Sequence, residues 1–158
     1  MEFDPADADL SLASLFTGWA LADELQRRLV ADGFADTRFA DGVVFQHLVG
    51  GPVTISTLAE RLGVSQQAAS KSVVELEKRG YLSREPDPAD ARARQVVLTA
   101  RGDAVIDAAR RHRAALESEL RTALGADRVE AARVVLVDVI NLLGAAPALR
   151  ARAARPPR

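Results

Sequence analysis

Apolar residues recur along most of this chain at steps of three and four positions, which is the spacing of amphipathic helices. The first such stretch, residues 10–30, is expected to end at Gly33, which breaks the pattern. Another begins after Thr99 and continues until Gly125. The apolar positions of these two predicted helices are Leu12, Leu15, Phe16, Trp19, Ala22, Leu25 and Leu29, then Val105, Ala108, Ala109, His112, Ala115, Leu116, Leu120 and Ala123.

Shorter helices are expected between these two. One covers residues 39–49 and is stopped by the glycines and proline at 50–52. Two more begin after Thr54 and Ser65, because a side-chain hydroxyl there can accept a hydrogen bond from an amide of the first turn. Gly63 is expected to make the turn between them, so the pattern predicts two helices joined by a tight turn.

The helix after Ser65 is expected to run to about Arg79 and to stop at Gly80. Residues 81–84 and 95–98 then alternate as strands, and the loop between them, PDPADARA, is polar and contains prolines. Two helices, a turn and a two-stranded ribbon form the outline of a winged helix-turn-helix. The expected fold is therefore mainly α with a small β-wing and terminal helices.

The last predicted helix, residues 129–143, is apolar around more than half of its circumference. A winged helix of roughly fifty residues cannot also cover this surface, so we expect a homodimer packed through its terminal helices. The alternative is a closed monomeric bundle. The expected regions are a helical dimerisation region (10–31 and 103–146), a winged helix-turn-helix (39–102) and a basic C-terminal tail (147–158).

Side chains suited to reading DNA share one face of the helix after Ser65. If Ala69 faces the core, a rotation of about 100° per residue brings Val73 and Leu76 close to it. The opposite face suits a major groove, because glutamine can pair with adenine, lysine can reach guanine or phosphate, and valine can meet a thymine methyl. An ordinary solvated helix face is the alternative. The predicted DNA-binding residues of this helix are Ser65, Gln66, Gln67, Ser70, Lys71 and Val74.

The loop of the predicted wing adds Asp90, Arg92 and Arg94 as predicted DNA-binding residues. An arginine at the loop tip suits a narrow minor groove, whose negative potential attracts it. Asp90 lies two positions before Arg92 and could hold it through a charge-assisted hydrogen bond. The alternative is a charged surface turn that binds nothing.

The segments LAERLGVS and SKSVVELEKRGYLSREPDPADARARQVVLTARG closely resemble the multiple antibiotic resistance regulator family, MarR. The most specific part is DP-x-D-x-R, followed three residues later by V-x-L-T-x-x-G. Ala91 departs from the pattern, since many relatives have a second arginine there. The helical order on both sides also fits, so the resemblance covers nearly the whole chain. The matching residues are Asp87, Pro88, Asp90, Arg92, Val96, Leu98, Thr99 and Gly102.

The resemblance implies a bacterial transcriptional regulator, a repressor or activator, that binds double-stranded DNA as a homodimer at a pseudo-palindromic operator. It also implies release by a small aromatic or anionic effector. His47 is a candidate ligand contact because relatives often have a ligand cavity near the end of the second helix. Trp19 is a second candidate, although packing beside Phe16 at the dimer interface is its alternative role.

Charge is distributed unevenly along the chain, whose formal net charge is -1. Residues 1–60 carry 3 basic and 10 acidic side chains, whereas residues 61–101 carry 8 basic and 5 acidic ones. Residues 102–158 carry 10 and 7. Positive charge therefore falls where a DNA-binding surface needs it, which permits DNA binding but is not diagnostic.

Composition disfavours other classes. The chain has no cysteine, which excludes disulfides, thiol redox sensing and cysteine-based zinc sites. No apolar run reaches the roughly 18 residues of a membrane helix, and the acidic start is not a signal peptide, so a cytoplasmic protein without membrane contact is expected. Only His47 and His112 could act as histidine bases or ligands, so neither an enzyme nor a metal or cofactor site is expected. A winged helix that binds another protein instead of DNA remains the alternative.

Overall fold

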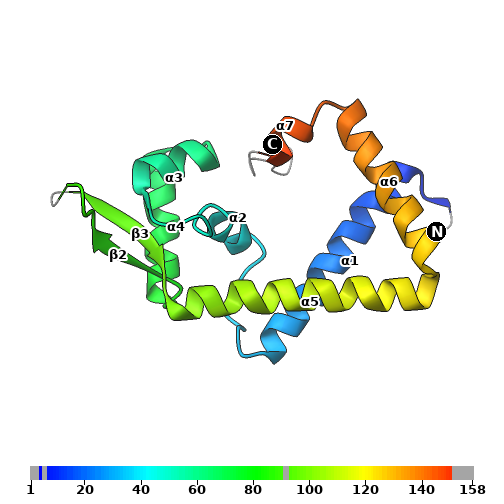
Figure 1. Ribbon diagram of the computed structural model, residues 1–158, viewed down its shortest axis with the longest axis horizontal. Helices are drawn as coiled ribbons and strands as arrows, with labels where there is room; N and C mark the ends of the chain where they lie inside the picture. Colours follow the sequence, from blue (N-terminus) through cyan, green and yellow to red (C-terminus); the bar gives the residue numbers. More distant parts are fainter. Residues whose placement is uncertain (1–3, 5–6, 91–92, 151–158) are drawn as a thin grey trace.

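The computed structural model describes residue 4, residues 7–90 and residues 93–150 of the chain. Figure 1 shows the long helix α5 as the base of the molecule, with α3, α4 and the wing toward one end and α1 and α6 toward the other. The predicted fold class, mainly α with a small β-wing, is confirmed. The elements are α1 (Leu10–Ala31), α2 (Asp41–Phe45), β1 (Val53–Thr54), α3 (Ile55–Leu62), α4 (Gln66–Lys78), β2 (Leu82–Pro86), β3 (Arg94–Leu98), α5 (Ala100–Leu124), α6 (Ala126–Leu142) and α7 (Ala146–Arg150).

The predicted helix starts are present. The hydroxyl oxygens of Thr54, Ser65 and Thr99 accept hydrogen bonds from the amide nitrogens three residues later, at 3.1, 3.2 and 3.1 Å. Each hydroxyl satisfies an amide that has no partner within its own helix. Gly63 ends α3 with φ of 54°, a left-handed conformation that glycine adopts without steric cost. Local side-chain chemistry therefore fixes where α3, α4 and α5 begin.

Three antiparallel strands form the sheet, in the order β1-β3-β2. Leu82 of β2 lies opposite Leu98, and the ladder continues to Pro86 opposite Arg94. On the other side of β3, Val53 of β1 lies opposite Val96. Two strands were predicted; β1 is a two-residue strand, too short to show any alternation of apolar and polar residues.

The winged part of the chain encloses its own core. Tyr81, Leu58, Val73 and Val96 have no exposed surface, and Leu76 is only 1% exposed. Ala69 is also fully buried, so the predicted inward face of α4 is confirmed. Helix α1 contributes Leu29 to this core, and α5 contributes Val105 and Ala108. The start of α5 and the end of α1 are therefore anchored to the winged part.

The V-x-L-T-x-x-G part of the sequence motif has a structural explanation. A Cβ atom at Gly102 would lie 2.3 Å from the backbone oxygen of Tyr81, so only glycine fits there. The Thr99 hydroxyl donates to the Gly80 oxygen at 2.6 Å, and the Thr99 amide donates to the Tyr81 oxygen at 3.1 Å. These contacts join the start of α5 to the turn that follows α4.

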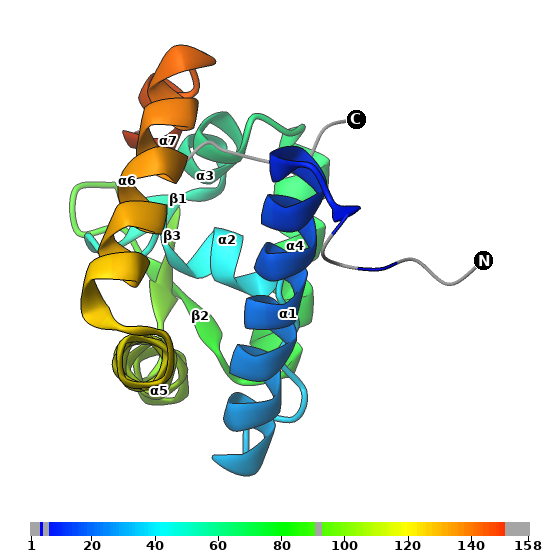
Figure 2. The same cartoon turned by 90° about the vertical axis from the view of Figure 1, so that its right-hand side faces the viewer.

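The terminal helices are less enclosed. Figure 2 shows α1 and α6 on opposite sides of the view, with α5 seen end-on below α6. No residue of α6 is buried, and Leu136 is 41% exposed. The amino-terminal half of α1 also exposes large apolar side chains, including Phe16 at 44% and Trp19 at 57%. A single chain thus leaves both of these apolar faces uncovered.

Some predicted boundaries were wrong. The helix expected over residues 39–49 is limited to Asp41–Phe45, and turns occupy residues 46–50. The short helix α7 lies across the boundary where the C-terminal tail was expected to begin. Within the ranges that the structure describes, no helix is both long and apolar enough to cross a membrane.

Candidate nucleic-acid interface and adjoining cavity

Helix α4 presents one buried face and one exposed face. Gln67 and Lys71 are exposed, opposite the buried residues, whereas Ser70 and Val74 are half-buried at the border. Ser65 is exposed at the amino-terminal end, where its hydroxyl caps the helix. Four predicted DNA contacts therefore lie away from the buried face of α4: Gln67 and Lys71 at its most accessible part, and Ser70 and Val74 at its border.

The two glutamines at the start of α4 have different surroundings. The side-chain nitrogen of Gln66 donates to the Ser56 hydroxyl of α3 at 3.2 Å. The side chain of Gln67 makes no hydrogen bond to the part of the chain that the structure describes. Gln66 is thus held against the preceding helix, and Gln67 is the side chain that extends into solvent.

The wing loop is shaped by Asp87. Its carboxylate accepts a hydrogen bond from the Ala89 amide at 2.8 Å, and its own amide donates to the Ala93 oxygen at 3.0 Å. The Ala89 amide, and next the Gln95 side chain, lower the pKa of Asp87 below its ordinary value. The first aspartate of the DP-x-D-x-R pattern therefore stays ionised and folds the loop.

The remaining wing predictions have different outcomes. Asp90 and Arg94 are exposed, and the Asp90 amide donates to the Asp87 oxygen at 3.2 Å. Arg92 and Ala91 lie outside the described residues, and with them the predicted contact between Asp90 and Arg92. The wing is joined to α4 through Arg84 of β2, whose Nε lies 3.3 Å from the Glu77 carboxylate.

A network of charged side chains, which the sequence did not reveal, surrounds the carboxyl end of α4. Arg79 forms a bidentate (two-pronged) ion pair with Asp41, with nitrogen-to-oxygen distances of 2.6 and 3.0 Å. Beside it, the Asp36 carboxylate accepts hydrogen bonds from the Tyr81 hydroxyl and, at 2.9 Å, from Arg101. The Arg101 guanidinium lies 4.7 Å from the centre of the Tyr81 ring. The network joins α4, the turn after it, α5 and the segment between α1 and α2.

The titration behaviour of these groups keeps the network charged. The hydrogen bonds with Asp41 raise the pKa of Arg79 despite the opposing effect of burial. Burial alone would raise the pKa of Asp36, but the Tyr81 hydrogen bond and the Arg101 charge outweigh it, and the pKa is lowered. Burial and the hydrogen bond to Asp36 raise the pKa of Tyr81. Near neutral pH, Arg79 and Asp36 are therefore ionised and Tyr81 is neutral.

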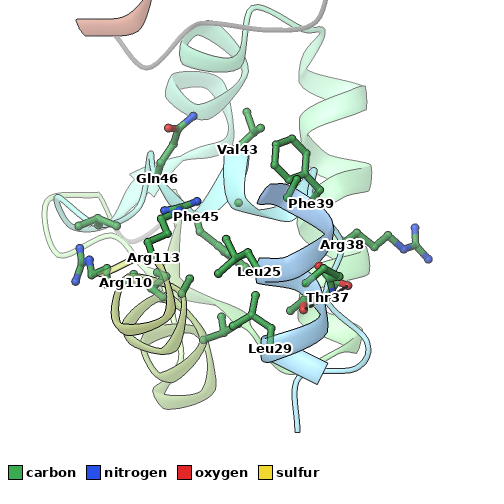
Figure 3. Close-up of a pocket in the computed structure, with 17 residues that line it drawn as sticks. Leu25, Leu29, Thr37, Arg38, Phe39, Val43, Phe45, Gln46, Arg110 and Arg113 are labelled. Carbon is green, nitrogen blue, oxygen red and sulfur yellow. Dashed lines mark hydrogen bonds between the residues drawn. The ribbon is translucent and has the colours of Figure 1, made fainter. Parts of the chain in front are cut away.

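A cavity of about 690 Å³ adjoins this network, between α1, α2 and α5 (Figure 3). Arg110 and Arg113 of α5 line it, and Arg113 extends toward α2 in Figure 3, whereas Arg38 points away. The cavity therefore combines an apolar interior with positive charge on its α5 side. Its apolar walls include Leu25, Leu29, Phe39, Val43, Phe45 and Val105.

The two predicted ligand contacts do not line this cavity. Trp19 lies on the exposed part of α1, where its ring packs edge-on against that of Phe16, with the ring centres 5.5 Å apart. His47 is 5% exposed, and its backbone oxygen accepts a hydrogen bond from Arg61 of α3 at 3.0 Å. His47 lies close to the cavity in sequence, next to Gln46 in its wall, but it belongs to the α3 side.

The second histidine packs between helices. The Nε2 atom of His112 in α5 lies 2.8 Å from the Asp32 carboxylate at the end of α1, within hydrogen-bonding distance. Among the described residues, no three histidine, cysteine, aspartate or glutamate side chains are grouped as a metal site requires.

Comparisons with known proteins agree with the sequence motif. A model of the MarR family matches residues 42–93, which include α3, α4 and β2. No curated protein sequence matches the chain. The resemblance to the MarR family is thus confirmed for the winged part.

Solved structures share the fold over most of the chain. YusO from Bacillus subtilis is 22% identical, with a TM-score of 0.65 over 84% of this chain and 91% of that one. A mutant of S. aureus MepR bound to an oligodeoxyribonucleotide is 18% identical, with a TM-score of 0.64 over 87% and 99%. Wild-type MarR from E. coli, in its apo form, is 24% identical, with a TM-score of 0.62 over 84% and 97%. At these identities, the comparison concerns the fold.

Proposed function

We propose that this protein is a homodimeric transcriptional regulator of the MarR type that binds double-stranded DNA at a pseudo-palindromic operator. The observation that carries the proposal is that α4 is buried on one side and exposed on the other. Ala69 and Val73 are fully buried, and Gln67 and Lys71 are exposed on the opposite side. A core-anchored helix with an exposed polar face is what a major-groove reader requires. The S. aureus MepR structure, which contains an oligodeoxyribonucleotide, has the same fold and supports DNA as the partner.

Five of the predicted DNA contacts have proposed roles. Gln67 pairs with a base edge, because its amide is free to reach the groove floor, and Lys71 reaches a guanine or a phosphate. Ser65 and the amino end of α4 lie against a phosphate. Arg92 enters the minor groove beside each half-site, and Arg94 contacts the backbone there.

The uncovered apolar faces of α1 and α6 support the proposed dimeric state. Their exposed residues include Trp19 at 57%, Leu136 at 41% and Leu142 at 85%, which is more than a stable monomer ordinarily leaves in water. A two-fold axis through these faces gives two α4 helices that enter successive major grooves, with half-site centres about 10 base pairs apart.

The cavity between α1, α2 and α5 is the proposed effector site. Apolar walls and the nearby Arg110 and Arg113 suit a small aromatic or otherwise apolar anion. Binding there regulates only if the ligand has different affinities for the DNA-bound and DNA-free arrangements of the dimer. We propose that the protein is a repressor and that the ligand releases it from DNA.

DNA binding is tested by recovering a duplex from random DNA with the full-length protein and then measuring affinity by fluorescence anisotropy. Gln67→Ala should lose about 1–3 kcal/mol on the recovered duplex and nothing on a scrambled one, since a base-edge contact carries sequence information. Arg92→Ala should weaken binding to both duplexes and lower the slope of log affinity against log salt by about one.

Arg128→Ala is the matched control, because it removes an exposed arginine from α6, which lies at the opposite end of the molecule from the wing (Figure 1). It should leave both affinities and the salt slope unchanged. Failure to recover any duplex would favour the alternative, a winged helix that binds another protein. Equal losses on both duplexes for Gln67→Ala would remove Gln67 from the base-reading role.

A further inference from the structure

The segment between the C-cap of α1 and the start of α2, residues 33–40, has one side on the cavity and the other on α4. On the cavity side, the Gln26 side chain of α1 donates to the backbone oxygen of Thr37 at 2.8 Å, and the Thr37 hydroxyl donates to the Phe34 oxygen at 2.7 Å. Thr37 is 7% exposed, and Thr37, Arg38 and Phe39 all line the cavity. The segment is thus fastened to α1 where it forms the cavity wall.

The other side of the segment is fastened to the end of α4. Arg79 donates to the backbone oxygen of Asp36 at 2.6 Å, in addition to its ion pair with Asp41. The side chains of Arg79 and Asp41 are only 17% and 11% exposed, so water screens this pair little. Asp41 also accepts a hydrogen bond from the Arg38 amide at 2.8 Å, which fixes the carboxylate to the cavity-lining segment itself.

We infer that Asp41 and Asp36 are positioning residues for α4 and that they transmit the state of the cavity to the DNA-reading helix. The inference rests on the proposed function and specifies its regulation. A ligand that presses on Thr37 or Phe39 shifts the segment that holds Asp41. Because a two-pronged guanidinium–carboxylate pair has a fixed geometry, Arg79 and the carboxyl end of α4 follow that shift. The angle of α4 in the groove then depends on the cavity.

The contacts between α1 and α5 do not provide the same route. Arg28 bonds to Glu119 at 2.9 Å, and His112 bonds to Asp32 at 2.8 Å, but both pairs join α1 to α5 alone. Helix α5 lies against the cavity as well, but its first turns are buried in the winged core through Gly102 and Val105. The segment of residues 33–40 touches the cavity, α1 and the end of α4.

A ligand-free test fills the cavity with a side chain. Ala109→Phe from α5 and Ala22→Phe from α1 each place a ring among the cavity-lining residues without altering the segment itself. Each variant is combined with Asp41→Asn in a double-mutant cycle, with anisotropy on the duplex recovered by selection as the readout. Two filling variants from opposite walls keep the test valid if one of them fails to fold, which thermal melting reveals.

Each filling substitution should lower affinity for the duplex by at least about 5-fold, the lower end of ordinary allosteric coupling. In the Asp41→Asn background the same substitution should change affinity by less than about 2-fold, because the connection to α4 is gone. Arg79→Lys, which keeps the charge but loses the two-pronged geometry, should also reduce the coupling. Asp32→Asn is the matched control: it removes a carboxylate that joins α1 to α5 only, and the effect of filling should persist.

A second readout needs no DNA. Amide hydrogen exchange at residues 76–81 should increase with either filling substitution in the wild-type background and should not respond to it in Asp41→Asn. The inference would be overturned if a filling substitution changed affinity and exchange equally in the wild-type and Asp41→Asn backgrounds. It would also be overturned if neither filling substitution changed affinity or exchange. If the protein binds no duplex but exchange responds as expected, the proposed function fails while the connection through Asp41 stands.

Discussion

The winged half of this molecule (residues 39–102) and its terminal half (residues 10–31 and 103–146) contain the same types of aliphatic residue, but they bury them to different extents. In the winged half, Leu58 and Val73 are completely buried by elements of one chain. In the terminal half, Leu142 and Leu143 are 85% and 75% exposed, and no residue of α6 is buried. The winged half closes around its own core, whereas the terminal half has helices whose apolar faces meet nothing in the same chain.

The difference shows that apolar periodicity identifies a helix face but not what covers it. The row of apolar residues on α4 faces β-strands and α3 a few residues away in sequence. The equivalent row on α6 has no such neighbours and, under the proposed function, is covered by a second copy.

The largest effect is expected at the proposed dimer interface. Arginine at both Leu136 and Ile140 should abolish the dimer, because a buried charge without a partner costs several kcal/mol. Light scattering after size exclusion should show a monomer. The double variant Arg128→Ala with Arg133→Ala, which alters the same helix without adding charge to its apolar face, should remain dimeric. A dimeric protein with both arginines in place would refute the assignment of α6 to the interface.

The next effect compares a buried and an exposed leucine. Leu58→Ala should lower the free energy of unfolding by about 2–5 kcal/mol, since it leaves a cavity in the winged core. In the monomeric variant with arginine at Leu136 and Ile140, Leu142→Ala should change it by less than about 1 kcal/mol, because the side chain is 85% exposed within one chain and no second copy covers it. Urea unfolding at one fixed protein concentration measures both. Equal losses would mean that the two halves do not differ in the way described.

A smaller loss is expected from Gly102→Ala. The new Cβ would lie 2.3 Å from the Tyr81 oxygen, so the start of α5 has to move away from the turn after α4. We expect a loss of about 1–3 kcal/mol, larger than the gain that alanine brings to a helix interior. Gly42→Ala is the matched control in α2, where an added Cβ meets nothing within 4 Å. It should not destabilise the protein, and a loss equal to that of Gly102→Ala would contradict the close-contact explanation.

The smallest effect concerns acid stability. The pKa of Asp36 is lowered in the folded protein, so its contribution to stability is complete above the unfolded value of about 3.9 and is lost as pH falls through the folded value. Asp36→Asn should therefore flatten the loss of stability with pH below about 4 and leave its slope near pH 7 unchanged. Melting temperatures across this range test it, and an unchanged acid slope would mean that Asp36 is not held by Tyr81 and Arg101.

The features that the sequence predicted correctly are local. The hydroxyls of Thr54, Ser65 and Thr99 begin their helices through bonds to amides three residues away, and one turn of chain is enough to recognise them. The inward face of α4 follows from helical geometry once Ala69 is taken as buried. These predictions needed no knowledge of which segments meet in space.

The features that were missed depend on contacts between distant segments. The pairing of Arg79 with Asp41 joins residues 38 positions apart, and no local pattern indicates it. Strand β1 exists because Val53 lies beside Val96, and its two residues show no periodicity of their own. The cavity is also a tertiary feature, which explains why the proposed ligand contacts Trp19 and His47 do not line it.

The mass of the DNA complex shows directly whether two chains bind one DNA site. In the proposed complex, two chains join through their terminal helices and present two α4 helices to that site. Analytical ultracentrifugation of the full-length protein with the duplex recovered by selection gives the number of chains per duplex. We expect two chains on one pseudo-palindromic duplex. On a duplex cut to a single half-site, we expect one chain, bound only at much higher protein concentration. A saturated complex with one chain on the intact duplex, bound as tightly as to the half-site, would contradict it.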